Sequence, residues 1–194
     1  MTDATFPARV VANANHEPPT DRSMTIRDAV DADVAAIATV LAANQGDSGL
    51  FQQPEHQLRC VVGDFVLAVN DAGKVEGCSA LHWHRTDNAE ILGVAVLPRA
   101  QGRGLGHALV KACIERAYTR ASDRDRLVLW LATAKPDYFA RFGFRTMSRL
   151  RLPTSVIWTK LLVVFQQRFS RWLPALWGRH TFMRHQATAV GIDR

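Results

Sequence analysis

The segment that most constrains this chain runs from Ala89 to Leu109 and reads AEILGVAVLPRAQGRGLGHAL. Its first part is rich in aliphatic residues that favour a strand, and Pro98 lacks a backbone donor, so the strand has to end near it. Gly102, Gly104 and Gly106 follow, and apolar residues then recur at helical spacing. The segment therefore predicts a strand, a tight glycine-rich turn and an amphipathic helix.

A glycine-rich turn at the start of a helix can bind an anion. The unpaired backbone N–H groups and the helix dipole favour negative charge at the same place, and Arg99 and Arg103 add positive charge. The spacing does not fit two common phosphate motifs: a dinucleotide fingerprint would need glycine at His107, and no G-x-x-x-x-G-K-[ST] run is present. We expect a phosphate or pyrophosphate at this turn; a strand-to-helix turn without a ligand is the alternative.

Length and charge limit the classes of protein that fit. The chain has 194 residues, of which 47% are hydrophobic, enough for one domain with a core. The net charge of +6 arises near the C-terminus: residues 145–194 hold nine Lys and Arg and one acidic residue, and the rest holds 15 basic and 17 acidic residues. Nucleic-acid binding would have to involve the tail alone, and we do not expect it.

The cysteines and the N-terminal segment indicate the compartment. Cys60, Cys78 and Cys113 are odd in number and widely spaced, which favours neither a disulfide framework nor a metal site. No window reaches 18 consecutive apolar residues, and residues 1–22 lack the apolar stretch of a signal peptide. We expect a disordered segment over 1–22, a folded domain over 23–153 and a cytoplasmic location.

Periodicity and turn signals predict the other elements of the domain. Asp31 and Asp33 offer N-cap chemistry for the first helix. Strands at 64–70 and 75–85 form an antiparallel meander with the strand of the glycine-rich segment. The remaining expected elements are a strand at 25–27, helices at 31–43, 53–60, 104–121 and 135–142, and strands at 126–131 and from 144 toward 152.

Residues 154–194 are expected to form a basic, amphipathic helical tail. Apolar residues from Val156 to Phe182 recur at helical spacing, with Lys160, Arg168 and Arg171 between them. Such a helix has to bury its apolar face, either on its own domain or against a second subunit as a homodimer. Peripheral contact with an anionic membrane is a third outlet, and we favour it less.

The run Gln101-Gly102-Arg103-Gly104-Leu105-Gly106 fits the pattern Q/R-x-x-G-x-G/A. With the preceding V-A-V-L-P and the later Y-F-A-R-F-G-F it resembles the acetyl-CoA signature of the GNAT N-acetyltransferase superfamily. The order of elements over 24–152 is also similar to that of the GNAT fold. The resemblance implies an α/β (α+β) fold: a mixed, mostly antiparallel sheet, splayed between its fourth and fifth strands and flanked by helices. Leu131-Ala132-Thr133, the Y-F-A-R-F-G-F run and Leu152-Pro153 are similar to acetyltransferase domains of N-acetylglutamate synthases.

The resemblance also implies a coenzyme site. Pantetheine would pair with exposed backbone on the splayed strand, and the diphosphate would lie on the glycine-rich turn. Phe139 stands where many GNAT enzymes have a tyrosine that protonates the leaving thiolate, so Tyr138 beside it becomes the candidate, with a packing role as the alternative. The expected coenzyme-binding residues are Val94, Ala95, Val96, Gln101, Gly102, Arg103, Gly104, Leu105, Gly106 and Phe139.

Glu90 is the candidate general base because it is the only carboxylate of the central strand. If the preceding hairpin has a three-residue loop, His84 lies opposite Glu90 and can share its proton. A two-residue loop instead places Arg85 opposite Glu90 as a cross-strand ion pair. His82 and His84 share a strand face, but no third metal ligand is evident, and no metal is expected.

The function that the resemblance implies is transfer of an acetyl group from acetyl-CoA to a primary amine. We expect a small acceptor such as an amino acid, and direct attack in a ternary complex, because no cysteine falls in the central strand. The alternatives are acetylation of a protein lysine or N-terminus, and a non-catalytic module that binds acyl-CoA.

Overall fold

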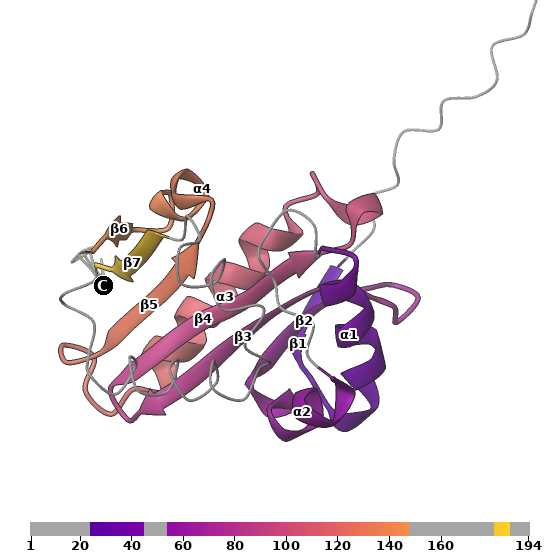
Figure 1. The fold of residues 1–194 in the computed structure, drawn as a ribbon, viewed down its shortest axis with the longest axis horizontal. Coiled ribbons are helices and arrows are strands. Elements are labelled where there is room, and N and C mark those ends of the chain that lie inside the picture. Colours follow the sequence, from indigo (N-terminus) through magenta and orange to yellow (C-terminus); the bar gives the residue numbers. More distant parts are fainter. Residues whose placement is uncertain (1–23, 45–53, 148–180, 187–194) are drawn as a thin grey trace, which may run out of the picture.

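The computed structural model describes residues 24–44, 54–147 and 181–186, which form one seven-stranded sheet with helices packed against it (Figure 1). The strand order is β1-β2-β3-β4-β5-β7-β6. Strands β4 and β5 are parallel, and the other neighbouring pairs are antiparallel. This mixed, mostly antiparallel sheet is the one that the sequence predicted.

The elements lie close to their expected positions. The strands are β1 (Met24–Asp28), β2 (Phe65–Asn70), β3 (Val75–Arg85), β4 (Asn88–Val96), β5 (Val128–Thr133), β6 (Phe144–Thr146) and β7 (Thr181–His185). The α-helices are α1 (Val34–Ala42), α2 (Glu55–Cys60), α3 (Leu105–Arg120) and α4 (Pro136–Ala140). Short 3-10 helices occupy Asp31–Asp33, Val62–Asp64 and Pro98–Ala100.

The sheet separates two groups of buried apolar side chains. Val34, Ile37 and Val40 of α1 belong to one group, and Val110 and Cys113 of α3 to the other. Leu67 and Cys78 of β2 and β3 belong to the first group and Val66 and Leu81 to the second, because successive side chains of a strand point to opposite faces. Leu105 and Leu109 at the start of α3 also join the first group. Helices α1 and α3 therefore cover opposite faces of the central strands, with α2 beside α1 (Figure 1).

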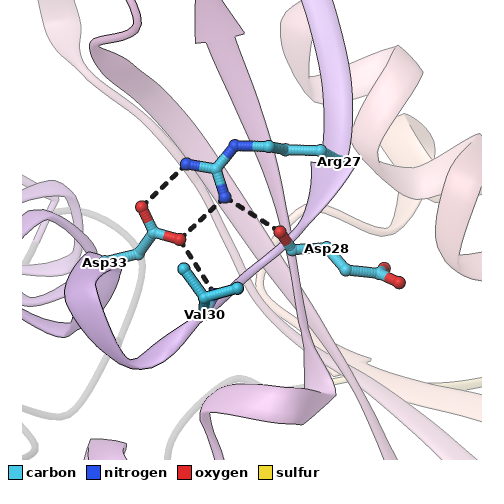
Figure 2. Close-up of polar contacts among 4 residues, drawn as sticks. All are labelled: Arg27, Asp28, Val30 and Asp33. Carbon is cyan, nitrogen blue, oxygen red and sulfur yellow. Dashed lines mark hydrogen bonds and ion pairs between the residues drawn. The ribbon is translucent and has the colours of Figure 1, made fainter.

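An ion pair fixes the turn between β1 and α1 (Figure 2). The Arg27 guanidinium donates to both carboxylate oxygens of Asp33 at 2.7 and 2.8 Å, and the Val30 N–H donates to the same carboxylate at 2.9 Å. Hydrogen bonding from Arg27 is the main reason why the pKa of Asp33 is lowered. The Asp33 carboxylate thus joins the end of β1 to the turn before α1. The sequence suggested that Asp33 caps α1, but its side chain makes no capping hydrogen bond to that helix.

Strand β7 corrects the prediction of a helical tail over residues 154–194. Residues Thr181–His185 insert between β5 and β6 and pair antiparallel with both, so this part of the tail belongs to the sheet. Helical spacing in the sequence could not show this, because the strand is defined by neighbours far along the chain. Met147 and Gln186 are described and belong to no strand, and residues 1–22, 148–180 and 187–194 lie outside the described residues.

The parallel pair β4–β5 is short. It is registered only over Asn88–Glu90 of β4 against Val128–Trp130 of β5, and β4 continues to Val96 without a partner strand on that side among the described residues. A bulge places Gly93 and Val94 opposite Ser79 of β3, and Gly93 has φ 63°, a backbone angle that glycine adopts without strain. The sheet is therefore splayed between β4 and β5, as expected.

Candidate active site

A pocket of about 510 Å³ opens where β4 and β5 separate. It is bounded by the second half of β4, the turn before α3, the end of β5 and helix α4. Of the residues predicted from the sequence, those that line it are Val94, Ala95, Val96, Gln101, Gly102, Gly104, Leu105, Gly106, Tyr138 and Phe139. Residues that were predicted from separate segments of the sequence therefore line one pocket in the structure.

The glycine-rich turn presents the start of α3 to this pocket. Gly102 and Gly104 have φ of 78° and 80°, which side-chain-bearing residues rarely adopt, and the helix begins at Leu105. The first N–H groups of an α-helix have no carbonyl partner within the helix, so they are available to an anion. Lys135, His107 and Arg141 also line the pocket; as scattered basic residues they gave no pattern in the sequence.

The side chain of Arg103 does not line the pocket. Its guanidinium donates to Oε2 of the buried Glu76 at 2.9 Å, and the Asn70 amide donates to the other oxygen of Glu76 at 3.0 Å. Arg103, which was predicted to add positive charge to the anion site, thus forms an ion pair with a carboxylate at the start of β3. Arg103 helps to fix the turn against the sheet.

Two side chains meet the backbone carbonyl of Val96 at the pocket. The amides of Asn44 and Gln101 each donate to this oxygen at 3.1 Å, and Asn44 also donates to the carbonyl of Val40. These contacts connect the end of α1 to the end of β4. Asn44 was not predicted as a site residue, because a single polar residue after a helix carries no motif.

Glu90 and His84 form a buried pair next to the splay point. His84 Nε2 lies 3.0 Å from Glu90 Oε2, and each side chain is 7% exposed. The predicted contact is therefore present, but neither of the two registers considered from the sequence is: the hairpin has a two-residue turn and a bulge between Trp83 and Arg85, so His82 lies opposite Glu90 and Arg85 opposite Asn88. Neither residue is among those that line the 510 Å³ pocket, which begins at the adjacent Ile91.

His84 and Glu90 have further neighbours on the same face of the sheet. The His84 ring stacks on the fully buried Trp130 with centroids 5.6 Å apart, and it meets the His82 ring edge to face at 4.9 Å. His82 Nδ1 lies 2.8 Å from Asp64 Oδ2, and both of these side chains are partly exposed to solvent. The hydrogen bond to Asp64 is the main cause of a raised pKa at His82.

Cross-strand register extends this row across the sheet. Glu90 lies opposite Trp130, Trp130 opposite Arg184 of β7, and Arg184 opposite Arg145 of β6. Opposed residues of neighbouring strands project from the same face, so two exposed arginines follow Trp130 on the face that carries Glu90. Neither arginine was predicted from the sequence, because the two become neighbours only when β7 pairs with β6.

Tyr138 and Phe139 occupy different surroundings. A Cβ placed on Gly106 would lie 2.8 Å from the Tyr138 hydroxyl, so this hydroxyl packs directly on the first turn of α3. Burial raises the pKa of the Tyr138 phenol, and the nearby Arg141, which stacks on the ring at 4.4 Å, opposes the shift. Phe139 is buried and packs on Phe144 in the core beside α3.

Other features bear on metal, redox and membrane chemistry. Within the described residues, no three His, Cys, Asp or Glu side chains gather as a metal site would require. All three cysteines are free, and burial raises the pKa of the Cys78 and Cys113 thiols to about 12 and about 11, which makes them poor nucleophiles. No helix in the described part of the chain has the length and apolarity needed to cross a membrane.

Known proteins share this arrangement. The family model described as "Acetyltransferase (GNAT) domain" matches residues 62–146. An amino-acid acetyltransferase of Mycobacterium tuberculosis is 35% identical over 130 residues, which cover 66% of this chain and 72% of that protein. An amino-acid acetyltransferase of Neisseria meningitidis is 31% identical over 131 residues, 67% of this chain but only 29% of that protein.

Solved structures agree with the sequence relatives. A Mycobacterium tuberculosis protein in complex with CoA and NLQ superposes with a TM-score of 0.69 at 27% identity, covering 84% of this chain and 99% of that one. N-acetylglutamate synthase from Neisseria gonorrhoeae, complexed with coenzyme A and N-acetyl-glutamate, shares the fold with a TM-score of 0.65 at 23% identity, over 85% of this chain and 35% of that one.

A sheet that splays beside a glycine-rich helix N-terminus, with a pocket between them, defines an acyl-CoA-dependent N-acetyltransferase. The chain belongs to the GNAT family of acetyltransferases.

Proposed function

We propose that this enzyme transfers the acetyl group of acetyl-CoA to the α-amino group of an amino acid. The observation that carries the proposal is the pocket at the splay point, which runs from the open backbone of β4 to the N-terminus of α3. Its length of exposed strand suits an extended pantetheine arm, and its helix N-terminus suits a diphosphate. The amino-acid acetyltransferase relatives support the choice of acceptor.

The coenzyme would contact this chain mainly through backbone. Val94 and Ala95 offer groups on the open side of β4, one N–H polarising the thioester oxygen as an oxyanion donor. The Val96 carbonyl already accepts from Asn44 and Gln101, so a pantetheine amide pairing with it would displace one of these side chains. The Gln101 N–H already donates to the Pro98 carbonyl, so the N–H groups from Gly102 to Gly106 would take the diphosphate, and Lys135 and Arg141 add positive charge.

The reaction needs a neutral amine and a group that accepts its proton. Glu90, paired with His84, would take a proton from the acceptor ammonium, directly or through water. The amine nitrogen then attacks the thioester carbonyl carbon and gives up its second proton to solvent, the C–S bond breaks, and CoA leaves as thiolate. The contact of Tyr138 with Gly106 supports a role in shaping the coenzyme site, with solvent protonating the thiolate.

The acceptor carboxylate would lie near the arginines that follow Trp130. Arg184 and Arg145 are exposed and share the sheet face of Glu90 by register. A guanidinium can hold a carboxylate through two hydrogen bonds, which orients the amino group of the same molecule. An amino acid, above all an acidic one, therefore fits this face better than an uncharged amine.

The test is release of CoA from acetyl-CoA with a panel of free amino acids, N-terminal peptides and lysine peptides, together with calorimetry of acetyl-CoA binding. We expect turnover with amino acids, L-glutamate among them, and no turnover with peptides. Glu90→Gln should abolish most turnover and leave acetyl-CoA affinity nearly unchanged, because Glu90 does not line the pocket. Turnover with peptides alone, or no heat with acetyl-CoA, would contradict the proposal.

A further inference from the structure

The side chains of Glu90, His84, His82 and Asp64 form one continuous group that leads from the buried splay point to the surface. Glu90 contacts His84 at 3.0 Å, His84 meets His82 ring to ring at 4.9 Å, and His82 contacts Asp64 at 2.8 Å. The Glu90 and His84 side chains are each 7% exposed, whereas those of His82 and Asp64 are 39% and 25% exposed. The group therefore leads from a buried pair to a pair that solvent reaches.

We propose that this group is the proton exit of the enzyme, in which His84 relays the proton taken up by Glu90 to His82, and Asp64 holds His82 ready to release it to solvent. The inference rests on the proposed role of Glu90 as the base. His84 and Glu90 would exchange the proton through their hydrogen bond, whereas His82 and Asp64 act through His84.

The need for such a route follows from burial. Glu90 gains one proton per turnover, and a carboxyl group that is 7% exposed cannot return it to bulk water rapidly by itself. A proton accepted at Nε2 of His84 leaves the imidazole from Nδ1, so the ring becomes neutral again as its other tautomer, and a ring flip or proton exchange with water restores the first tautomer before the next turnover. The edge-to-face rings of His84 and His82 are close enough for one water or a ring rotation to connect their nitrogens.

The charges around His82 suit the final step. Asp64 faces it from the 3-10 helix Val62–Asp64, Glu90 from β4 and His84 from β3 itself. The hydrogen bond to Asp64 raises the pKa of His82 against the effect of burial, and the charges of Asp64 and Glu90 act in the same direction. The raised pKa favours the protonated form of His82, and its 39% exposed side chain can exchange the proton with water.

The relay is tested first without any acceptor, by NMR titration of the histidine ring nitrogens in the full chain. We expect Asp64→Asn and Glu90→Gln each to lower the titration midpoint of His82, because both carboxylates raise its pKa. His56→Gln, with its side chain exposed on α2, serves as the control and should not change the His82 midpoint. A His82 midpoint that does not respond to Glu90→Gln would overturn the relay.

The second test is the steady-state rate of CoA release with L-glutamate, because Glu90 has to lose its proton before each new turnover. We expect His82→Gln to lower this rate roughly 10-fold at neutral pH, and added imidazole buffer to restore it, because an external base replaces the missing exit. A purely structural role for His82 would give no dependence on buffer concentration. Thermal unfolding and acetyl-CoA calorimetry identify variants that fail to fold, and Asp64→Asn probes the same link without changing the imidazole.

The outcomes separate the two proposals. If Glu90→Gln is slow while His82→Gln keeps the wild-type rate without any buffer effect, the relay is wrong and Glu90 remains the base. If Glu90→Gln keeps the wild-type rate, the base assignment fails, and the NMR coupling alone then reports whether the four side chains share a proton.

Discussion

His84 Nε2 lies 3.0 Å from Glu90 Oε2, although the two residues are not opposite one another in the β3–β4 ladder. The bulge between Trp83 and Arg85 offsets the ladder, so that His82 takes the opposing position while the His84 side chain still reaches the carboxylate. A local irregularity of β3 thus lets two histidines approach one glutamate from the same face.

This geometry predicts that Glu90 and His84 act as a unit. Glu90→Gln should lower kcat about 100-fold, since an amide cannot accept the proton, and His84→Gln should lower it less. The double variant should be no slower than Glu90→Gln alone, because the second change removes a partner that has already lost its function. Steady-state assays of the three variants over pH 6 to 9 provide the measurement. Additive losses in kcat would show that the two residues act independently.

The contact between Tyr138 and Gly106 predicts a rescue. Gly106→Ala would place a methyl group 2.8 Å from the Tyr138 hydroxyl, so we expect weaker acetyl-CoA binding and a lower Tm. Tyr138→Phe removes the hydroxyl, and the double variant should recover most of both losses, because the next ring atom would be 3.7 Å away. Calorimetry and thermal unfolding test this.

The kcat of Tyr138→Phe by itself reports on the general acid. A rate above about half that of the wild type assigns Tyr138 to packing, since a thiolate of ordinary thiol pKa can leave unaided. A large loss that shrinks as pH rises through the raised pKa of the Tyr138 phenol would instead make Tyr138 the acid.

The ion pair of Arg27 and Asp33 predicts acid sensitivity (Figure 2). The pKa of Asp33 is lowered on folding, mainly by hydrogen bonds from Arg27, so its contribution to stability is complete above the ordinary value of 3.8 and is lost as pH falls through the lower folded-state pKa. Asp33→Asn should lower the free energy of unfolding by about 1 kcal/mol at pH 7, a modest figure because Arg27 is partly exposed. Urea unfolding at pH 7 and below pH 4 should show this difference shrinking with acid.

The pairing of Arg103 with Glu76 predicts that Arg103 serves stability more than coenzyme binding. Arg103→Ala removes the guanidinium from the buried Glu76 carboxylate, which keeps its hydrogen bond from the Asn70 amide, and we expect a loss of about 1–2 kcal/mol in unfolding free energy. The acetyl-CoA Kd should change less than about threefold, since the guanidinium does not line the pocket. Adding Glu76→Gln should recover stability, and Arg99→Ala is the control for loss of an exposed charge. A Kd that rises tenfold in Arg103→Ala would instead place this arginine on the phosphates.

The register of Arg184 predicts acceptor specificity. Arg184→Ala should raise the KM for L-glutamate at least about 10-fold, and Arg184→Lys should give an intermediate value, because lysine keeps the charge and loses the two-point contact. The KM for acetyl-CoA should not change, since Arg184 is not among the residues that line the coenzyme pocket. Equal effects on both substrates would show that the substitution disturbs β7 and not the acceptor.

The sequence by itself determined the central segment of this protein. The strand over 89–97, the turn at Gly102 and Gly104 and the helix from Leu105 all follow from local backbone preferences, and the structure has each of them where expected. The β3–β4 hairpin and the buried strand β5 were predicted for the same reason. These features depend on residues close together in the chain, where glycine, proline and apolar spacing act directly.

The tertiary structure alone decided what those elements meet. It directed the Arg103 guanidinium to Glu76, brought Asn44 to the Val96 carbonyl, and inserted Thr181–His185 as a strand beside β5 where the sequence suggested a helical tail. The bulges in β3 and β4 likewise set which side chains oppose Glu90. Each of these contacts joins residues far apart along the chain, and its formation depends on competing partners that no local pattern records.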